Sequence, residues 1–217
     1  MVSSCTTVMY PEKESDMSFS SEVKEELAKH ISPARHCQIA ELAALMNFSG
    51  QYGRSAEGDF MIGFQTENEA VVRKGFTLLQ KTFNIETKIF VRENSHLKRV
   101  KVYTIEITDP EEIQVIFQAL RLVTNSIDQG TLVLSDMLVV QQNCCKRAFI
   151  RGAFLASGSI SDPEKGYHFE IVCSDAKRAE QLQTIIRSFS VDAKIVQRKK
   201  SHVVYVKEGA QIVDMLA

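Results

Sequence analysis

Four sequence patterns occur twice in the same order in this 217-residue chain. This internal repeat constrains the possible fold more than any other feature. The clearest match is between two heptamers, FNIETKI beginning at Phe83 and FSVDAKI beginning at Phe189. Each heptamer follows a stretch with apolar residues at three- and four-residue intervals, which is typical of a helix, and each leads into a segment rich in lysine and arginine. Before these, each copy has a helix that ends in Ser-Gly and then a strand-like piece. Four elements in the same order predict a duplicated fold.

The two helices that end in Ser-Gly carry small residues along one face. The first ends at Ser49-Gly50 and the second at Ser157-Gly158, 108 positions later. Residues four apart share a helix face, and the small ones are Ala40 and Ala44 in the first helix, with Phe48 closing the row, and Ala148, Gly152 and Ala156 in the second. Such a stripe allows two helix axes to approach more closely than the usual spacing of roughly 8–10 Å. Each stripe could instead pack against its own sheet, but its occurrence in both copies favours contact between the two helices at a pseudo-twofold axis.

Several stretches of the sequence resemble known motifs. LAALMNFSG (42–50) and IRGAFLASG (150–158) are similar to the two motifs of the LAGLIDADG homing endonucleases. More specifically, CCKRAFIRGAFLASGSISDPEKGYHFEI (144–171) resembles the WhiA family of bacterial sporulation transcription regulators, and SSEVKEELAK resembles the usual start of that family. The resemblance covers nearly everything in 17–217.

This resemblance implies an α+β fold of the LAGLIDADG homing-endonuclease type. Its two αββαββ repeats are related by a pseudo-twofold axis, their interface helices pair, and their antiparallel sheets form a saddle that sits astride DNA. We accordingly assign 17–128 to the first repeat and 129–217 to the second, with both halves forming one unit. Residues 1–16 are polar, patternless and outside the family pattern, which predicts a disordered extension. The family also has a C-terminal helix-turn-helix domain, to which no part of this sequence corresponds.

The motif comparison bears on catalysis. In the nucleases the second-to-last motif position is an acid, and the two acids together hold the divalent metal ions for phosphodiester cleavage. Hard cations such as Mg²⁺ bind carboxylate oxygen, but the matched residues here are Ser49 and Ser157, whose hydroxyls are neutral. The resemblance therefore implies a chain that is not an enzyme. A remodelled metal site would need acids from the following loops, and the candidates are Glu57, Asp59, Asp162 and Glu164.

No other residue pattern predicts a cofactor, a metal site or a small-molecule substrate. The chain has no glycine-rich phosphate loop, and its five histidines lack metal-ligand spacing. The five cysteines are odd in number and lack a C-x-x-C pair, and the adjacent Cys144 and Cys145 make a poor disulfide and a poor zinc pair. Free thiols in a reducing cytoplasm are expected. A reactive-thiol role for Cys144 or Cys145 stays open beside simple packing at a helix start.

Positive charge is concentrated in the two repeated segments. The net charge of the chain is −1, but residues 88–101 carry +4 and residues 194–207 carry +5, so the remainder sums to −10. In the fold implied by the resemblance, these segments are the outer hairpins on the underside of the saddle. The candidate DNA contacts are Lys88, Arg92, Lys98, Arg99 and Lys101 in the first half and Lys194, Arg198, Lys199 and Lys200 in the second. Strand alternation puts only some of each set on the concave face, and the alternative is a solvated edge hairpin.

Together these observations predict a non-catalytic DNA-binding transcription regulator linked to sporulation and cell division. We expect a cytoplasmic, nucleoid-associated protein with double-stranded DNA as its main partner and another transcription regulator as a further one. No apolar run approaches the ~20 residues that span a bilayer, so no membrane partner is expected. The alternatives are a protein-interaction module within such a regulator and, less favoured, an active LAGLIDADG endonuclease.

Overall fold

The computed structural model describes residues 18–55, 58–94, 100–126, 129–162, 164, 166 and 168–216. The extension predicted at 1–16 and the candidate DNA contacts Lys98 and Arg99 lie outside these residues. Within the described part of the chain, no helix combines the length and the apolar character needed to cross a membrane.

The first half begins with two helices, α1 (Phe19–Lys29) and α2 (Arg35–Ser49). It continues with the strands β1 (Gly50–Arg54) and β2 (Phe60–Thr66), the helix α3 (Glu69–Phe83), the strands β3 (Lys88–Asn94) and β4 (Val100–Ile107), and the helix α4 (Pro110–Leu120). The connection to the second half contains β5 (Leu122–Thr124), β6 (Gly130–Leu134) and the short 3-10 helix η1 (Leu138–Val140).

The second half repeats the order of the first. It consists of α5 (Asn143–Ser157), β7 (Gly158–Ile160), β8 (Phe169–Cys173), α6 (Ala176–Arg187), β9 (Lys194–Arg198), β10 (Ser201–Val206) and α7 (Gly209–Leu216). The predicted αββαββ order therefore occurs twice, beginning at α2 and at α5.

The two antiparallel sheets share one strand order. The first is β3-β4-β2-β1-β6-β5 and the second is β9-β10-β8-β7, so each strand of the second sheet has an equivalent in the first. β6 is an addition to the first sheet, where Thr131 lies opposite Gln51 of β1. It covers the edge of β1 that would otherwise leave backbone groups unpaired. The sheet of the first half thus extends beyond the boundary predicted at 128/129.

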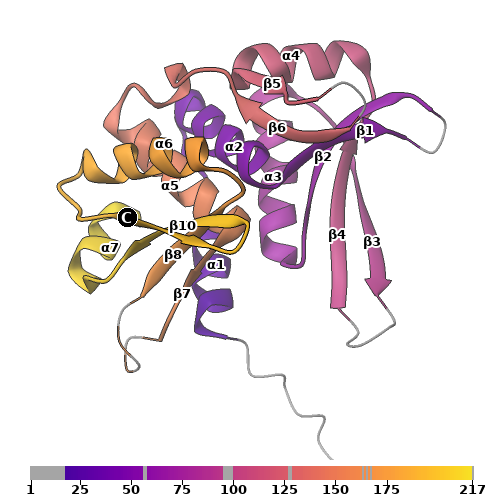
Figure 1. Ribbon diagram of the computed structural model, residues 1–217. Coiled ribbons are helices and arrows are strands. Elements are labelled where there is room, and N and C mark those ends of the chain that lie inside the picture. Colours follow the sequence, from indigo (N-terminus) through magenta and orange to yellow (C-terminus); the bar gives the residue numbers. More distant parts are fainter. Residues whose placement is uncertain are drawn as a thin grey trace, which may run out of the picture.

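The helices α2 and α5 pack against each other at the centre of the molecule, with one sheet to each side (Figure 1). Their small residues make the contact, and Ala40, Ala44 and Ala148 are completely buried. A Cβ added to Gly152 would lie 2.4 Å from the backbone oxygen of Glu41 and 2.9 Å from the Cβ of Ala44. Because only glycine lacks a Cβ, this close approach depends on Gly152. The predicted pairing of the two interface helices is confirmed.

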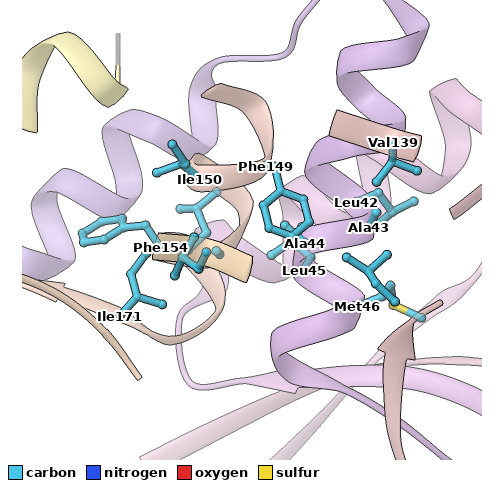
Figure 2. Packing of buried hydrophobic residues seen from close by; sticks show 14 of the residues in the cluster. Leu42, Ala43, Ala44, Leu45, Met46, Val139, Phe149, Ile150, Phe154 and Ile171 are labelled. Atoms are coloured by element: carbon cyan, nitrogen blue, oxygen red, sulfur yellow. The ribbon is translucent and has the colours of Figure 1, made fainter. Parts of the chain in front are cut away.

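One hydrophobic cluster runs through both halves. It contains Leu42 and Leu45 of α2 together with Phe149 and Phe154 of α5, all of them buried (Figure 2). The ring of Phe154 stacks on that of Phe169 in β8, with centroids 5.1 Å apart. Burial of each such side chain contributes roughly 1.5–3 kcal/mol. The two repeats therefore share one core around the helix pair.

A buried arginine also joins the second half to the first. The guanidinium of Arg178 in α6 donates to the carbonyl of Leu132 in β6 at 2.6 Å and to the Oδ1 of Asn47 in α2 at 3.4 Å. The same Asn47 oxygen accepts a hydrogen bond from the backbone N–H of Leu134 at 3.1 Å. These bonds hold β6 against the helix pair, and they satisfy polar groups that would be costly to bury alone.

Candidate nucleic-acid interface

The interface helices α2 and α5 end at equivalent serines, which match the metal-ligand positions of the nucleases. The Ser49 hydroxyl donates to the carbonyl of Leu45 at 2.7 Å, one turn earlier in α2. The Ser157 hydroxyl donates to the carbonyl of Val172 in β8 at 2.8 Å. Both side chains therefore satisfy main-chain acceptors near the helix ends.

The glycines after these serines are required by space. A Cβ on Gly50 would lie 2.1 Å from the backbone oxygen of Met46, and a Cβ on Gly158 would lie 2.7 Å from that of Phe154. Their φ angles, −72° and −88°, are ordinary for any residue. Each glycine therefore allows the chain to turn sharply against the last helical turn and does not adopt a left-handed conformation.

Neither serine suits the hard divalent cation that the nuclease fold implies at this place. Each hydroxyl is already used as a hydrogen-bond donor and carries no negative charge, whereas such cations prefer carboxylate oxygen. Among the residues that the structure describes, Asp59, Asp162 and Glu164 belong to no group of three or more potential ligands, and Glu57 lies outside those residues.

The two faces of the β3–β4 hairpin differ in their surroundings. Ile89 and Val91 share a hollow with residues of α3, so they lie on the helix-covered face. Lys88, Phe90 and Arg92 alternate with them along β3 and are exposed on the opposite face. We call this opposite face the open face of the first sheet. Two of the predicted DNA contacts, Lys88 and Arg92, lie on it.

Lys101 lies on the helix-covered face instead. It is opposite Glu93 in the strand register, one position away from Arg92, and so points away from the open face. The pKa of Glu69, at the start of α3, is lowered chiefly by a hydrogen bond from Arg73, with a smaller contribution from the charge of Lys101. Lys101 therefore does not belong to the candidate contact surface. The sequence predicted otherwise because it does not determine which face of the hairpin a residue occupies.

The β9–β10 hairpin repeats the arrangement of the first hairpin. Ile195 packs against the core, whereas Lys194 and Arg198 are exposed on the other side, the open face of the second sheet. Lys199 and Lys200 form the two-residue turn of this hairpin, and Lys199 has a left-handed φ of 53°. The sequences KIFVR and KIVQR thus place one lysine and one arginine at equivalent positions on the two open faces.

Acidic residues share the open faces with these cations. Glu106 lies opposite Lys88 in the strand register. Glu170 in β8 lies 3.0 Å from the Nη1 of Arg198 and 3.0 Å from the Nε2 of His168. Burial opposes ionisation of Glu170, but the hydrogen bond from His168 and the charge of Arg198 outweigh it and lower its pKa. The positive charge of the surface is therefore partly neutralised.

Sequence patterns missed these facing acids, since their position depends on strand register. They also missed a group at the other end of the helix pair, where the potential ligand atoms of His36, Cys37, Cys144 and Cys145 all lie within 4.8 Å of one another. One signal was available: the offset of 108 that relates the two Ser-Gly ends also relates His36 to Cys144 and Cys37 to Cys145.

Two packed helices at a pseudo-twofold axis, each followed by antiparallel strands and a covering helix, define a LAGLIDADG-type double repeat. The chain is similar to the crystal structure of full-length DUF199/WhiA from Thermatoga maritima, with a TM-score of 0.66 and 22% identity over 92% of this chain and 61% of that one. It is similar to the N-terminal LAGLIDADG domain of DUF199/WhiA, with a TM-score of 0.68 and 21% identity over 92% and 88%. The structure of I-DmoI in complex with DNA and Mn gives a TM-score of 0.57 and 12% identity over 85% and 98%. The predicted fold class is confirmed.

Sequence comparison defines the family. Residues 35–123 match the WhiA N-terminal LAGLIDADG-like domain, and residues 146–217 match the WhiA LAGLIDADG-like domain. A probable cell division protein WhiA of Lachnoclostridium phytofermentans is 52% identical over 92% of this chain, and one of Clostridium novyi is 40% identical over 92%. The chain belongs to the WhiA family, as its motifs predicted. It spans 64% and 63% of the length of these two relatives.

Proposed function

We propose that this chain is a DNA-contacting, non-cleaving part of a transcription regulator linked to sporulation and cell division, acting at the nucleoid in the cytoplasm. The observation that carries the proposal is the equivalent placement of Lys88 and Arg92 on one open face and of Lys194 and Arg198 on the other. Duplex DNA is itself a pseudo-twofold polyanion, so paired cations on related sheets suit both strands. The name of the relatives supports the link to cell division, and the complex of I-DmoI with DNA supports DNA as the partner.

The expected binding is weak and salt-sensitive. The four open-face cations and the turn residues Lys199 and Lys200 allow about four to six phosphate contacts. Each neutralised phosphate contributes about −0.9 to the slope of log affinity against log salt, which gives roughly −4 to −5, with a Kd of roughly 10⁻⁴–10⁻⁶ M. The facing acids Glu106 and Glu170 hold the affinity at the weak end of this range. Phosphate contacts position a protein on DNA but read no sequence.

The test is fluorescence anisotropy with several unrelated duplexes across a salt series. Variant one combines Lys88→Gln with Arg92→Gln, and variant two combines Lys194→Gln with Arg198→Gln. Each variant is expected to weaken binding about equally for every duplex. It should also reduce the slope of log affinity against log salt by the contribution of about two phosphate contacts. Lys101→Gln is the matched control, because it removes one charge from the same hairpin on the opposite face.

Two results would contradict the proposal. One is that the parent chain binds no duplex at low salt. The other is that Lys101→Gln, which removes one charge, weakens binding half as much as the open-face variants, which remove two, since the effect would then follow total charge and not position.

A protein-interaction surface is the second candidate, and exposed apolar side chains favour it. On the open faces, Phe90 is 42% exposed, Val172 41% and Val196 38%. Such residues contribute little to phosphate binding but suit contact with another protein, for which another transcription regulator is the expected class. This candidate predicts no duplex binding at low salt, the result that contradicts the first one.

A further inference from the structure

The first turns of α2 and α5 bring four potential metal ligands together. The Nδ1 of His36 lies 3.2 Å from the Sγ of Cys145, 3.4 Å from the Sγ of Cys37 and 4.0 Å from the Sγ of Cys144. All four ligand atoms lie within 4.8 Å of one another. This is the only such group of histidine, cysteine and acidic side chains among the residues that the structure describes.

The three distances from His36 are close to those expected around one ion. A tetrahedral zinc ion with bonds of about 2.3 Å to sulfur and 2.0–2.1 Å to nitrogen has nitrogen–sulfur edges of about 3.6 Å and sulfur–sulfur edges of about 3.8 Å. Of the three observed nitrogen–sulfur distances from His36, two are shorter and one is longer than the expected nitrogen–sulfur edge. A four-iron cluster places its thiolates on four different irons and would need them further apart. A single thiophilic ion therefore fits better than a cluster.

The two halves contribute equivalent ligands. His36 and Cys37 are the second and third residues of α2, and Cys144 and Cys145 are the second and third residues of α5. The group thus lies on the pseudo-twofold axis, at the opposite end of the helix pair from Ser49. The distance from Ser49 to the group along α2 is about 18 Å. An ion there would join the two repeats directly.

The N-terminal ends of α2 and α5 favour negative charge at the group. Neither α2 nor α5 has a side-chain N-cap hydrogen bond or an acid in its first turn, so the positive helix ends are uncompensated. Three thiolates and one neutral imidazole around one divalent ion would leave a net charge of −1 between the two helix ends.

Solvent can reach the group. Cys37 and Cys145 are buried, whereas His36 and Cys144 are exposed. A hollow of about 250 Å³ borders the site, and its lining includes His36, Gln142 and Cys145. Two of the four ligands are therefore packed in the interior, and the other two are accessible to an ion from solvent.

We propose that His36, Cys37, Cys144 and Cys145 bind one zinc ion in a tetrahedral site that fastens the N-terminal ends of α2 and α5 together. Structural zinc sites commonly use one histidine and three cysteines. The proposal does not rest on DNA binding, because the four ligands lie on α2 and α5 and not on the open faces of the sheets.

The test uses the full chain, without a polyhistidine tag and kept reduced. After incubation with Zn²⁺ and desalting, elemental analysis is expected to find about one zinc ion per chain. Replacement by Co²⁺ is expected to give the strong visible absorption of tetrahedral cobalt and thiolate-to-cobalt charge transfer. Zinc is also expected to raise the Tm, since a ligand that binds only the folded state stabilises it.

Matched variants identify the ligands. Cys144→Ser and His36→Ala alter exposed side chains, so folding is expected to survive while the bound zinc, the cobalt spectrum and the Tm increase are lost. His30→Ala is the control, because this exposed histidine does not belong to the group, and the variant should retain one ion. The proposal is overturned if the reduced parent retains no zinc, or if Cys144→Ser and His36→Ala keep the stoichiometry and the cobalt spectrum of the parent.

Discussion

The Nε of Arg151 in α5 lies 2.9 Å from the Oε1 of Glu41 in α2, and both side chains are buried. The Nζ of Lys74 in α3 lies 2.6 Å from the same oxygen and donates to the carbonyls of Leu27 and His30 at the end of α1. One carboxylate thus links three helices directly, and Lys74 ties the end of α1 to them. Buried ion pairs contribute little net stability, but removal of one partner leaves an uncompensated charge. This group therefore favours one arrangement of the helices over alternatives.

Glu41→Gln should strongly destabilise the chain. It leaves the ammonium of Lys74 and the guanidinium of Arg151 buried without a counter-charge, and we expect a loss of about 3–5 kcal/mol in the free energy of unfolding. Urea denaturation measures this loss. The control is Glu26→Gln, which breaks an exposed pair with Lys29 and should change stability little. Equal effects of the two substitutions would show that burial is not the cause.

Gly152→Ala should also destabilise the helix pair. The new methyl group would lie 2.4 Å from the backbone oxygen of Glu41, so α2 and α5 would have to separate. Overpacking of this kind costs roughly 1–3 kcal/mol. Gly53→Ala is the control, because its nearest neighbouring atom would be 3.8 Å away. Thermal denaturation of both variants should show a lower Tm only for Gly152→Ala, and an unchanged Tm for that variant would refute the close approach.

The chain should not cut DNA with Mg²⁺ or Mn²⁺, because Ser49 and Ser157 replace the acids that hold the metal ions in the nucleases. Plasmid nicking assays provide the measurement. Ser49→Asp with Ser157→Asp is expected to restore some Mn²⁺ binding, detectable by calorimetry, without cleavage. Metal-dependent cleavage by the parent that disappears in Asp59→Asn or Asp162→Asn would show that the metal site has moved.

The metal-free, reduced chain should lose stability between pH 9 and 12. Burial raises the pKa of Cys173 to about 12 and of Cys37 to about 11, both from an ordinary value of 9.0. The folded state keeps these protons where the unfolded state has lost them, so the contribution is complete below pH 9 and declines as the pH rises through the folded pKa values. Urea denaturation at several pH values should show this decline, and Cys173→Ala should make it shallower. A pH profile for Cys173→Ala parallel to that of the parent would contradict the assignment.

Much of the architecture followed from local patterns and their repetition. The matched heptamers at Phe83 and Phe189 predicted the duplication, and the stripe of Ala148 and Gly152 predicted the paired helices. Each copy could be recognised from its own local pattern, because helix and strand periodicities are set over a few residues. The two copies could then be compared. The loss of the motif acids at Ser49 and Ser157 could likewise be read directly from the sequence.

Relationships between distant segments were decided only by the tertiary structure. Arg92 and Lys101 belong to one basic segment, yet strand register puts them on opposite faces of the hairpin. β6 joins the first sheet although it follows the predicted boundary. His36 and Cys145 are 109 residues apart and meet only because α2 and α5 pack side by side in register. Periodicity specifies which face a residue shares with its neighbours, but docking of helices and pairing of strands determine what that face meets.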